Sequence, residues 1–241
     1  MKVLTVYAHP NPKSFCHAVL QQFTKGLADA GHSSEVVDLY AIRFNPVFQM
    51  ADFASYVHES IPKEVLERMN LKKYILDSMR GPFQRFFVAR WLRGKDDPSI
   101  AKFIHAHRPK DVVAQWEKVN QAEGLAFIAP VFWLGFPAIL KGWFDRVLVP
   151  GVSFSIDANG AVHAALTNIR KIAGISTYGR PWWHVRLIVG DLPRRHITHY
   201  FKALCGWGAR AKYLALYDTN RTTAARRDRF LAQVRRLVKQ L

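Results

Sequence analysis

The sequence predicts an α/β protein with a doubly wound, five-stranded parallel sheet. Short apolar runs alternate with stretches of helical periodicity, which is the pattern of parallel strands joined by crossover helices. The length of 241 residues fits one domain with a sizeable core. Hydrophobic residues make up 49% of the chain and charged residues 22%, which are ordinary values for a globular protein.

Five apolar runs have the length of buried strands, at Val3–Ala8, Glu35–Leu39, Leu125–Val131, Ile172–Thr177 and Ala211–Tyr217. The first run is followed by a polar turn and a helix from about Phe15 to Ala30, which ends at Gly31. Further helices are expected at about 109–122 and from 222 to the end of the chain. This order of elements fits a flavodoxin-like sheet.

Two segments need separate interpretation. Residues 46–108 do not fit the alternation, and we expect a mostly helical insertion after the second strand, within a single domain of residues 1–241. In the last helix, apolar residues recur at helical spacing, which predicts that one face packs on the sheet. The basic residues of that helix are then expected to lie in water: Arg227, Arg235, Arg236 and Lys239.

Charge and composition narrow the function. The formal charge of +17 favours anionic partners, but no helix-turn-helix, zinc-finger or RNP-like motif is present, so we expect no nucleic-acid partner. Cys16 and Cys205 have no framework spacing, and the histidine pairs at 105/107 and 196/199 lack acidic or cysteine neighbours, so no metal is expected. Without a signal-peptide pattern or an apolar run of about 18 residues, a cytoplasmic location is expected.

Ligands of doubly wound sheets bind beyond the carboxyl ends of the strands, so the loops after the first, third and fourth strands form the candidate site. The first loop, AHPNPKSF, places His9 and Ser14 just before a helix, whose free N–H groups favour an anion. Ser14 is also a candidate N-cap. The loop is neither a GxGxxG nor a Walker sequence, which argues against a Rossmann dinucleotide site or a P-loop.

The second loop carries large aromatic side chains that would normally enter a core. Phe132, Trp133 and Phe136 follow a central strand and precede a helix, which indicates either a planar ligand against the loop or packing under the insertion. The third loop, STYGRPWW, contains Gly179, which permits close approach of the backbone. A flat cofactor with an anionic tail suits all three loops, and flavin is the leading candidate.

Three stretches carry a resemblance to a known family: YAHPNPKSF, DLYAIRFNPVF and PVFWLGFPAILKGWFDRV. The chain resembles the NAD(P)H:quinone oxidoreductases, the DT-diaphorase-like flavoproteins, over about two thirds of its length. The resemblance implies a flavodoxin-like fold, non-covalent FAD or FMN (FAD is favoured), and commonly a homodimer. It also implies a flavin-dependent oxidoreductase that passes two electrons from NAD(P)H to a quinone or similar acceptor.

The resemblance further implies roles for single residues. Flavin phosphates would meet His9, Ser14 and Phe15. The polar edge of the ring would touch a short turn made of Thr177, Tyr178 and Gly179. The isoalloxazine would be lined by Pro130, Val131, Phe132, Trp133 and Leu134.

The sequence departs from the family pattern at several positions. Tyr178 replaces a glycine, which is expected to narrow the approach to the ring. The family's catalytic tyrosine and histidine fall on His184 and Gly190, so only His184 can still donate a hydrogen bond from a side chain. We therefore expect His184 to act near the charge that develops on the ring. Packing of this loop histidine beside two tryptophans is the alternative.

Two further interpretations stay open. The segment RGPFQRFFVARWLRGK, residues 80–95, combines aromatic and basic residues at helical spacing, which is typical of peripheral contact with an anionic membrane. A lid helix or a dimer-contact helix would give the same pattern. The second function class is a regulatory flavodoxin-like subunit that binds flavin without significant turnover.

Overall fold

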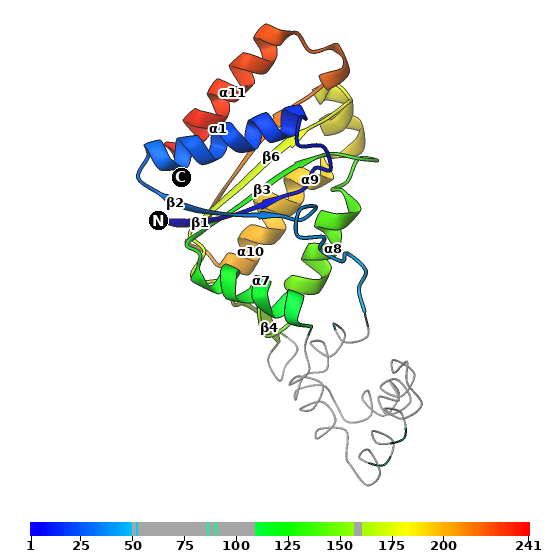
Figure 1. Ribbon diagram of the computed structural model, residues 1–241, viewed down its shortest axis with the longest axis vertical. Coiled ribbons are helices and arrows are strands. Elements are labelled where there is room, and N and C mark those ends of the chain that lie inside the picture. Colours follow the sequence, from blue (N-terminus) through cyan, green and yellow to red (C-terminus); the bar gives the residue numbers. More distant parts are fainter. Residues whose placement is uncertain (50–51, 53–85, 87–89, 91–108, 157–160) are drawn as a thin grey trace.

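Figure 1 shows the computed structural model of the chain, in which helices cover both faces of a central sheet. The structure describes residues 1–49, 52, 86, 90, 109–156 and 161–241. The expected insertion at 46–108 and the aromatic segment at 80–95 therefore lie almost entirely outside the described residues. Phe86 and Arg90 of that segment are helical. That residues 1–241 form a single domain stays a prediction.

The central sheet has five parallel strands in the order β2-β1-β3-β6-β7. They are β1 (Lys2–Tyr7), β2 (Ser33–Asp38), β3 (Gly124–Pro130), β6 (Lys171–Thr177) and β7 (Arg210–Leu216). Each expected strand is present, with ends that lie within two residues of the prediction. The strand order reverses between β1 and β3, which confirms the doubly wound, flavodoxin-like fold.

The helices form two layers, visible above and below the sheet in Figure 1. One layer consists of α1 (Phe15–Asp29) and α11 (Ala224–Val238). The other contains α7 (Lys110–Gln121), α8 (Ala138–Val147) and a helical run of η2 (His184–Val189), α9 (Leu192–Arg195), η3 (His196–Phe201) and α10 (Lys202–Cys205). The remaining elements are the 3-10 turn η4 (Thr219–Arg221) and an antiparallel pair, β4 (Phe154–Ile156) with β5 (Val162–Ala164).

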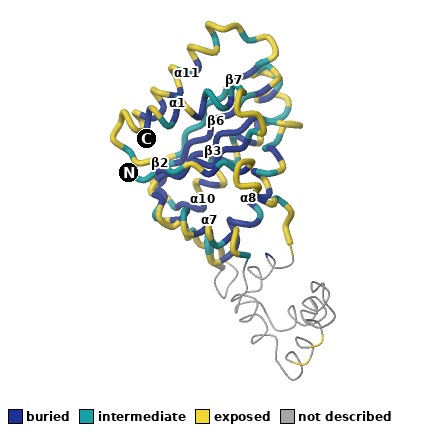
Figure 2. Tube along the Cα trace, in the orientation of Figure 1, coloured by how far each residue is buried: buried dark blue, intermediate teal, exposed yellow. Residues whose placement is uncertain are grey.

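The sheet divides the core in two, and Figure 2 shows its central strands as the most buried part of the described chain. All seven residues of β3 are buried because helices cover both of its faces. On one side, Phe23 of α1 and Val234 of α11 belong to the same buried cluster as Ile128. On the other side, Phe127 packs its ring against Phe144 at a centroid distance of 5.2 Å. The expected apolar face of the last helix is confirmed, because its buried residues belong to the core.

A buried arginine fixes α8, the helix that follows the aromatic loop. Arg146 Nε donates to Asp52 Oδ2 at 2.8 Å, and Nη1 donates to Asp111 Oδ2 at 2.7 Å and to the Asn45 carbonyl at 2.7 Å. The Arg146 side chain is 1% exposed. A buried charge is tolerated only with such partners, so these bonds hold α8 against the chain around residue 45.

The sequence-based placement of His184 in a loop is wrong, because His184 begins the π-helical turn η2. Tryptophan, valine and isoleucine dominate this stretch, and their local preference for strands hides the helix. Pro181 comes directly before the helical residues Trp182 and Trp183, and its carbonyl accepts from the Val185 N–H at 3.2 Å.

Candidate active site

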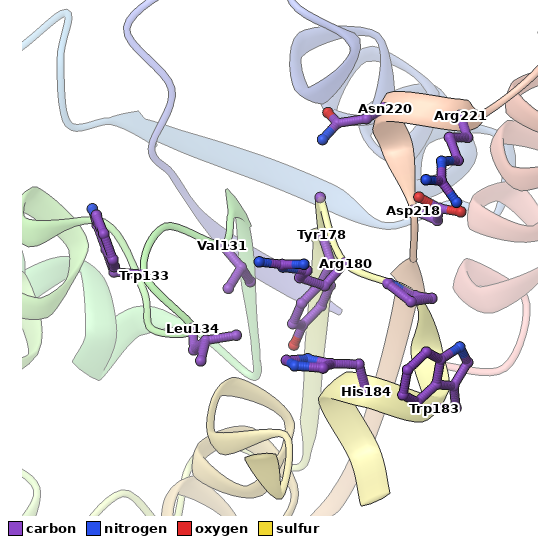
Figure 3. Close-up of a pocket in the computed structure, with 12 residues that line it drawn as sticks. Val131, Trp133, Leu134, Tyr178, Arg180, Trp183, His184, Asp218, Asn220 and Arg221 are labelled. Atoms are coloured by element: carbon purple, nitrogen blue, oxygen red, sulfur yellow. The ribbon is translucent and has the colours of Figure 1, made fainter. Parts of the chain in front are cut away.

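A cavity of about 730 Å³ lies at the carboxyl end of the sheet, where the loops after β3, β6 and β7 meet. Pockets for small molecules have volumes of about 300–1,000 Å³, so a ring system fits here. The lining residues, most of them labelled in Figure 3, are Val131, Trp133, Leu134, Tyr178, Gly179, Arg180, Pro181, Trp183, His184, Asp218, Asn220 and Arg221.

The loop after β3 is a tight, strained turn. Phe132 and Gly135 exchange two backbone hydrogen bonds of 3.0 Å, and the two residues between them have positive φ, 50° at Trp133 and 63° at Leu134. Such a conformation is costly for large side chains, and it persists mainly at functional sites. Trp133 is 102% exposed in this turn. The backbone conformation thus holds the indole ring in solvent, where a ligand or a partner can contact it.

Tyr178 anchors the loop after β6 from inside the protein. Its side chain is 1% exposed, its Oη donates to Asp191 Oδ1 at 2.6 Å and lies 2.6 Å from Tyr213 Oη. Burial, above all, raises the pKa of Tyr178, so the hydroxyl stays a donor. The hydroxyl of Tyr178 is thus engaged in the interior, while the residue also lines the larger cavity. That Tyr178 narrows the approach to a flavin ring stays a prediction.

Asp191 joins this loop to the helical run, and the sequence analysis missed it. The residue is 2% exposed and adopts the left-handed conformation, with φ of 47°. Besides Tyr178, its carboxylate accepts from Tyr217 Oη at 2.8 Å, and Arg186 Nε lies 3.6 Å away. Two hydroxyl donors and a guanidinium compensate the buried charge and hold the cavity wall in place.

His184 lines the same cavity as the loops after β3 and β6. Figure 3 shows its ring pointing from the start of η2 toward Leu134 and Tyr178. Its Nδ1 is buried and has no hydrogen-bond partner among the described residues. Buried polar atoms in native proteins are rarely unpaired, so this nitrogen indicates a group that the described residues do not supply.

A smaller cavity of about 160 Å³ lies next to α1, lined by His9, Ser14, Phe15, Cys16, Thr177, Thr219, Thr222 and Arg227. It brings together four of the predicted residues from two different loops. Ser14 is the N-cap of α1, as predicted, and its Oγ accepts from the His17 N–H at 3.2 Å. His9 Nδ1 accepts from the Asn11 N–H at 3.0 Å, and burial lowers the pKa of the His9 imidazole.

The smaller cavity has the chemistry of an anion site. The N-terminus of α1 supplies N–H groups and the positive end of a helix dipole. Arg227 adds a cation: its side chain is exposed to solvent, as expected, and also lines this cavity. Thr222 Oγ1 is buried without a hydrogen-bond partner in the described part of the chain. The sequence analysis missed the loop after β7, although its carboxyl end must meet the same edge of the sheet.

The two cavities are neighbours along the chain. Thr177 lines the smaller one, and the next residue, Tyr178, lines the larger one. In the loop after β7, Thr219 and Thr222 face the smaller cavity while Asn220 and Arg221 face the larger one. A single elongated ligand with an anionic end and a flat end would therefore span both.

Some predicted residues lie elsewhere. Pro130 is buried as the last residue of β3, and Phe132 is 48% exposed at the base of the strained turn, and neither lines the two cavities. Phe136 packs its ring against Phe144 of α8 at 5.4 Å and near His196 of η3 at 6.2 Å. Packing of the loop aromatics under the insertion stays a prediction, because the insertion lies almost entirely outside the described residues.

Two features are absent from the described part of the chain. No group of three or more His, Cys, Asp or Glu side chains in the described ranges is arranged to hold a metal ion. Across the same ranges, no helix has the length and apolarity needed to cross a membrane.

The chain belongs to the flavodoxin-like fold family, whose model matches residues 1–241. It is 28% identical over 155 residues to ribosyldihydronicotinamide dehydrogenase [quinone] of Rattus norvegicus, an alignment of 64% of this chain and 54% of that protein. It is 29% identical over 154 residues to NAD(P)H dehydrogenase [quinone] 1 of the same species, covering 64% and 45%. The chain thus spans about half the length of the curated relatives it matches.

One solved structure is similar in both fold and sequence. It is a putative quinone reductase from Klebsiella pneumoniae, with a TM-score of 0.71 and 26% identity, over 100% of this chain and 84% of that one. An NAD(P)H:quinone oxidoreductase from Methanothermobacter marburgensis has a TM-score of 0.66 at 24% identity over 99% and 98% of the two chains, which supports the fold alone.

Proposed function

We propose that the protein is a flavin-dependent oxidoreductase that transfers two electrons from NAD(P)H to a quinone or a similar planar acceptor. One observation carries this proposal. The smaller cavity, which has a positive charge suited to an anion, adjoins the larger cavity, which is walled by aromatic rings, at the switch point of a flavodoxin-like sheet. The names of the rat relatives and of the Klebsiella protein support the same reaction class.

The residues of the smaller cavity fit the phosphate end of FAD or FMN. His9, Ser14 and Phe15 surround the N-terminus of α1, and Thr177 faces them from β6. Arg227 supplies the positive charge, and the unpaired Thr222 hydroxyl supplies a further donor. A phosphate would accept hydrogen bonds from both the Arg227 guanidinium and the Thr222 hydroxyl, so the residues of this cavity fit the phosphate end of a flavin.

The larger cavity fits the flavin ring and the substrates. When bound, flavin accepts a hydride from NAD(P)H and passes two electrons on. The chain has to orient the ring and admit one flat substrate at a time, and Val131, Leu134 and Gly179 provide close apolar and backbone contact for this. His184 projects into the cavity and would donate a hydrogen bond to the charge that develops during reduction.

The experiment is a titration of the purified protein with FAD and with FMN, followed by flavin fluorescence and absorbance. We expect one site per chain and weaker binding by Arg227→Gln, because a charge-assisted hydrogen bond is worth about 1.5–3 kcal/mol, or roughly 10–100-fold in affinity. Arg236→Gln removes the same charge from an exposed position near the other end of α11 and should bind like the wild type.

A protein that binds neither flavin would contradict the proposal. Equal flavin affinities of the wild type, Arg227→Gln and Arg236→Gln would show that flavin binds but that Arg227 does not contact it. The regulatory alternative predicts a bound flavin that NAD(P)H does not reduce, so adding NAD(P)H to the loaded protein separates the two function classes.

We also propose that the protein forms a homodimer. Several large apolar side chains near the cavity are exposed in the single chain, namely Trp182, Leu187, Ile188 and Leu192. Several large apolar side chains exposed on one short stretch of a single chain are commonly covered by a partner. Light scattering should give twice the mass of 27.6 kDa, and a monomer at micromolar concentration would contradict it. A cytoplasmic location and peripheral membrane contact through residues 80–95 remain predictions from the sequence.

A further inference from the structure

The larger cavity contains two arginines whose charges are not neutralised. Arg180 and Arg221 line it, and neither guanidinium has a hydrogen bond or an ion pair within the described residues. Three arginines elsewhere in the described chain are paired with aspartates: Arg146 with Asp52, Arg186 with Asp191 and Arg235 with Asp29. Among the described residues of the lining, Asp218 is the only carboxylate, so the cavity has a surplus of positive charge.

Arg180 extends from a fixed piece of backbone. The Asp218 N–H donates to the Arg180 carbonyl at 3.0 Å, and the Thr219 N–H donates to the Tyr178 carbonyl at 2.9 Å. The buried Tyr178 hydroxyl also anchors this loop in the interior, because it donates a hydrogen bond to Asp191. Figure 3 shows the Arg180 side chain reaching from this loop toward Val131, across one side of the cavity. Because the backbone of this loop is fixed, only the side-chain rotamers of Arg180 have to be ordered when it binds an anion.

Aromatic rings flank these cations. Trp133 and Trp183 line opposite sides of the cavity in Figure 3, and they are 102% and 48% exposed. Exposed indole faces offer flat apolar surface for a second ring, and a guanidinium nearby recognises a carboxylate, sulfonate or phosphate. The combination fits a flat ligand with an anionic substituent better than a neutral one.

We propose that the electron acceptor is a quinone-like ring carrying an anionic substituent, which Arg180 binds, with Arg221 as the second cation. This inference rests on the proposed function and names its substrate class. NAD(P)H and one solvent proton reduce the ring by two electrons and two protons, giving NAD(P)⁺ and the reduced ring. The anionic group takes no part in this exchange and serves for recognition only.

The test uses the flavin-loaded protein and a matched pair of acceptors, a neutral naphthoquinone and its sulfonated derivative. For each variant, the ratio of kcat/KM for the two acceptors is measured, because a ratio cancels changes in flavin content. Arg180→Gln should lower kcat/KM for the sulfonate by about tenfold or more, as expected for loss of a charged hydrogen bond. The neutral quinone should lose clearly less than the sulfonate, because it makes no ionic contact with Arg180.

Arg236→Gln is the matched control, because it removes the same charge from an exposed position outside the cavity, and its ratio should equal that of the wild type. A ratio that Arg180→Gln leaves unchanged would overturn the inference, and so would an equal loss with both acceptors. A change only in the preference for NADPH over NADH would overturn it too, since the anion would then belong to the donor. A protein that reduces neither acceptor would contradict the proposed function itself. If the neutral quinone is reduced, the proposed function holds, and the ratio then tests only the preference for an anionic substituent.

Discussion

His184 occupies the position at which a single side chain most directly affects the proposed chemistry. Its ring lines the larger cavity, and its Nδ1 lacks a partner in the described chain. Replacing it by phenylalanine keeps an aromatic ring but removes the donor. Loss of one well-placed donor costs about 10²–10³ in rate, and less where the site is open, so we expect a drop of about tenfold or more in flavin reduction by NAD(P)H. Stopped-flow absorbance measures this rate.

The control for that variant is His199→Phe, because His199 is exposed and does not line the cavity. Flavin affinity should stay close to that of the wild type in both variants. If His184→Phe reduces its flavin as fast as the wild type, His184 is a packing residue, and hydride transfer depends on the flavin and the surrounding backbone.

Residue-level prediction from the sequence succeeded where the cause is local. Ser14 caps α1 because a serine directly before a helix can accept a hydrogen bond from a first-turn N–H, and both groups are close in the sequence. Arg227 could not be assigned in that way, because helical periodicity places it only on the outer face of α11. Its role depends on the contact of α1 with α11, which lie more than two hundred positions apart. Asp191 is likewise recognised only by the three side chains that surround it.

At the level of elements, the packing of α8 determines where the strained turn lies. Gly142 faces Pro46, the first residue of the expected insertion, and a Cβ at this position would lie 2.2 Å from the Pro46 carbonyl oxygen. Gly142→Ala should therefore destabilise the protein by about 1–3 kcal/mol, even though alanine favours helix by about 1 kcal/mol. Urea unfolding followed by circular dichroism measures the change.

Gly208→Ala provides the matched control, since nothing lies within 4 Å of the added methyl group and the residue has no positive φ. Its free energy of unfolding should change by about 0.5 kcal/mol or less. Equal stability of Gly142→Ala and the wild type would show that α8 can shift away from Pro46 at little cost.

The strands were predictable as elements, and the helical run at 184–205 was not. Buried parallel strands are continuous apolar runs, so β1, β3 and β6 are evident in the sequence. The run from η2 to α10 combines β-branched and aromatic residues with a break at Gly190 and Asp191, both with positive φ. Its helical form depends on packing against β6 and β7, which no local pattern reveals.

At the level of the whole molecule, the topology explains why distant loops form one site. The order β2-β1-β3-β6-β7 places the carboxyl ends of β1, β3, β6 and β7 along one edge. The candidate site could be predicted from the loops after β1, β3 and β6, since that rule needs only the strand assignment. The contribution of the loop after β7 required the structure, because its polar residues have no motif of their own.

The central claim is that this edge binds a flavin that NAD(P)H reduces and a quinone reoxidises. The direct measurement is the visible absorbance of the flavin-loaded protein without oxygen, first after NAD(P)H and then after a quinone is added. We expect the oxidised-flavin absorbance to disappear with NAD(P)H and to return with the quinone. A bound flavin that stays oxidised in the presence of excess NADH and NADPH would contradict the claim.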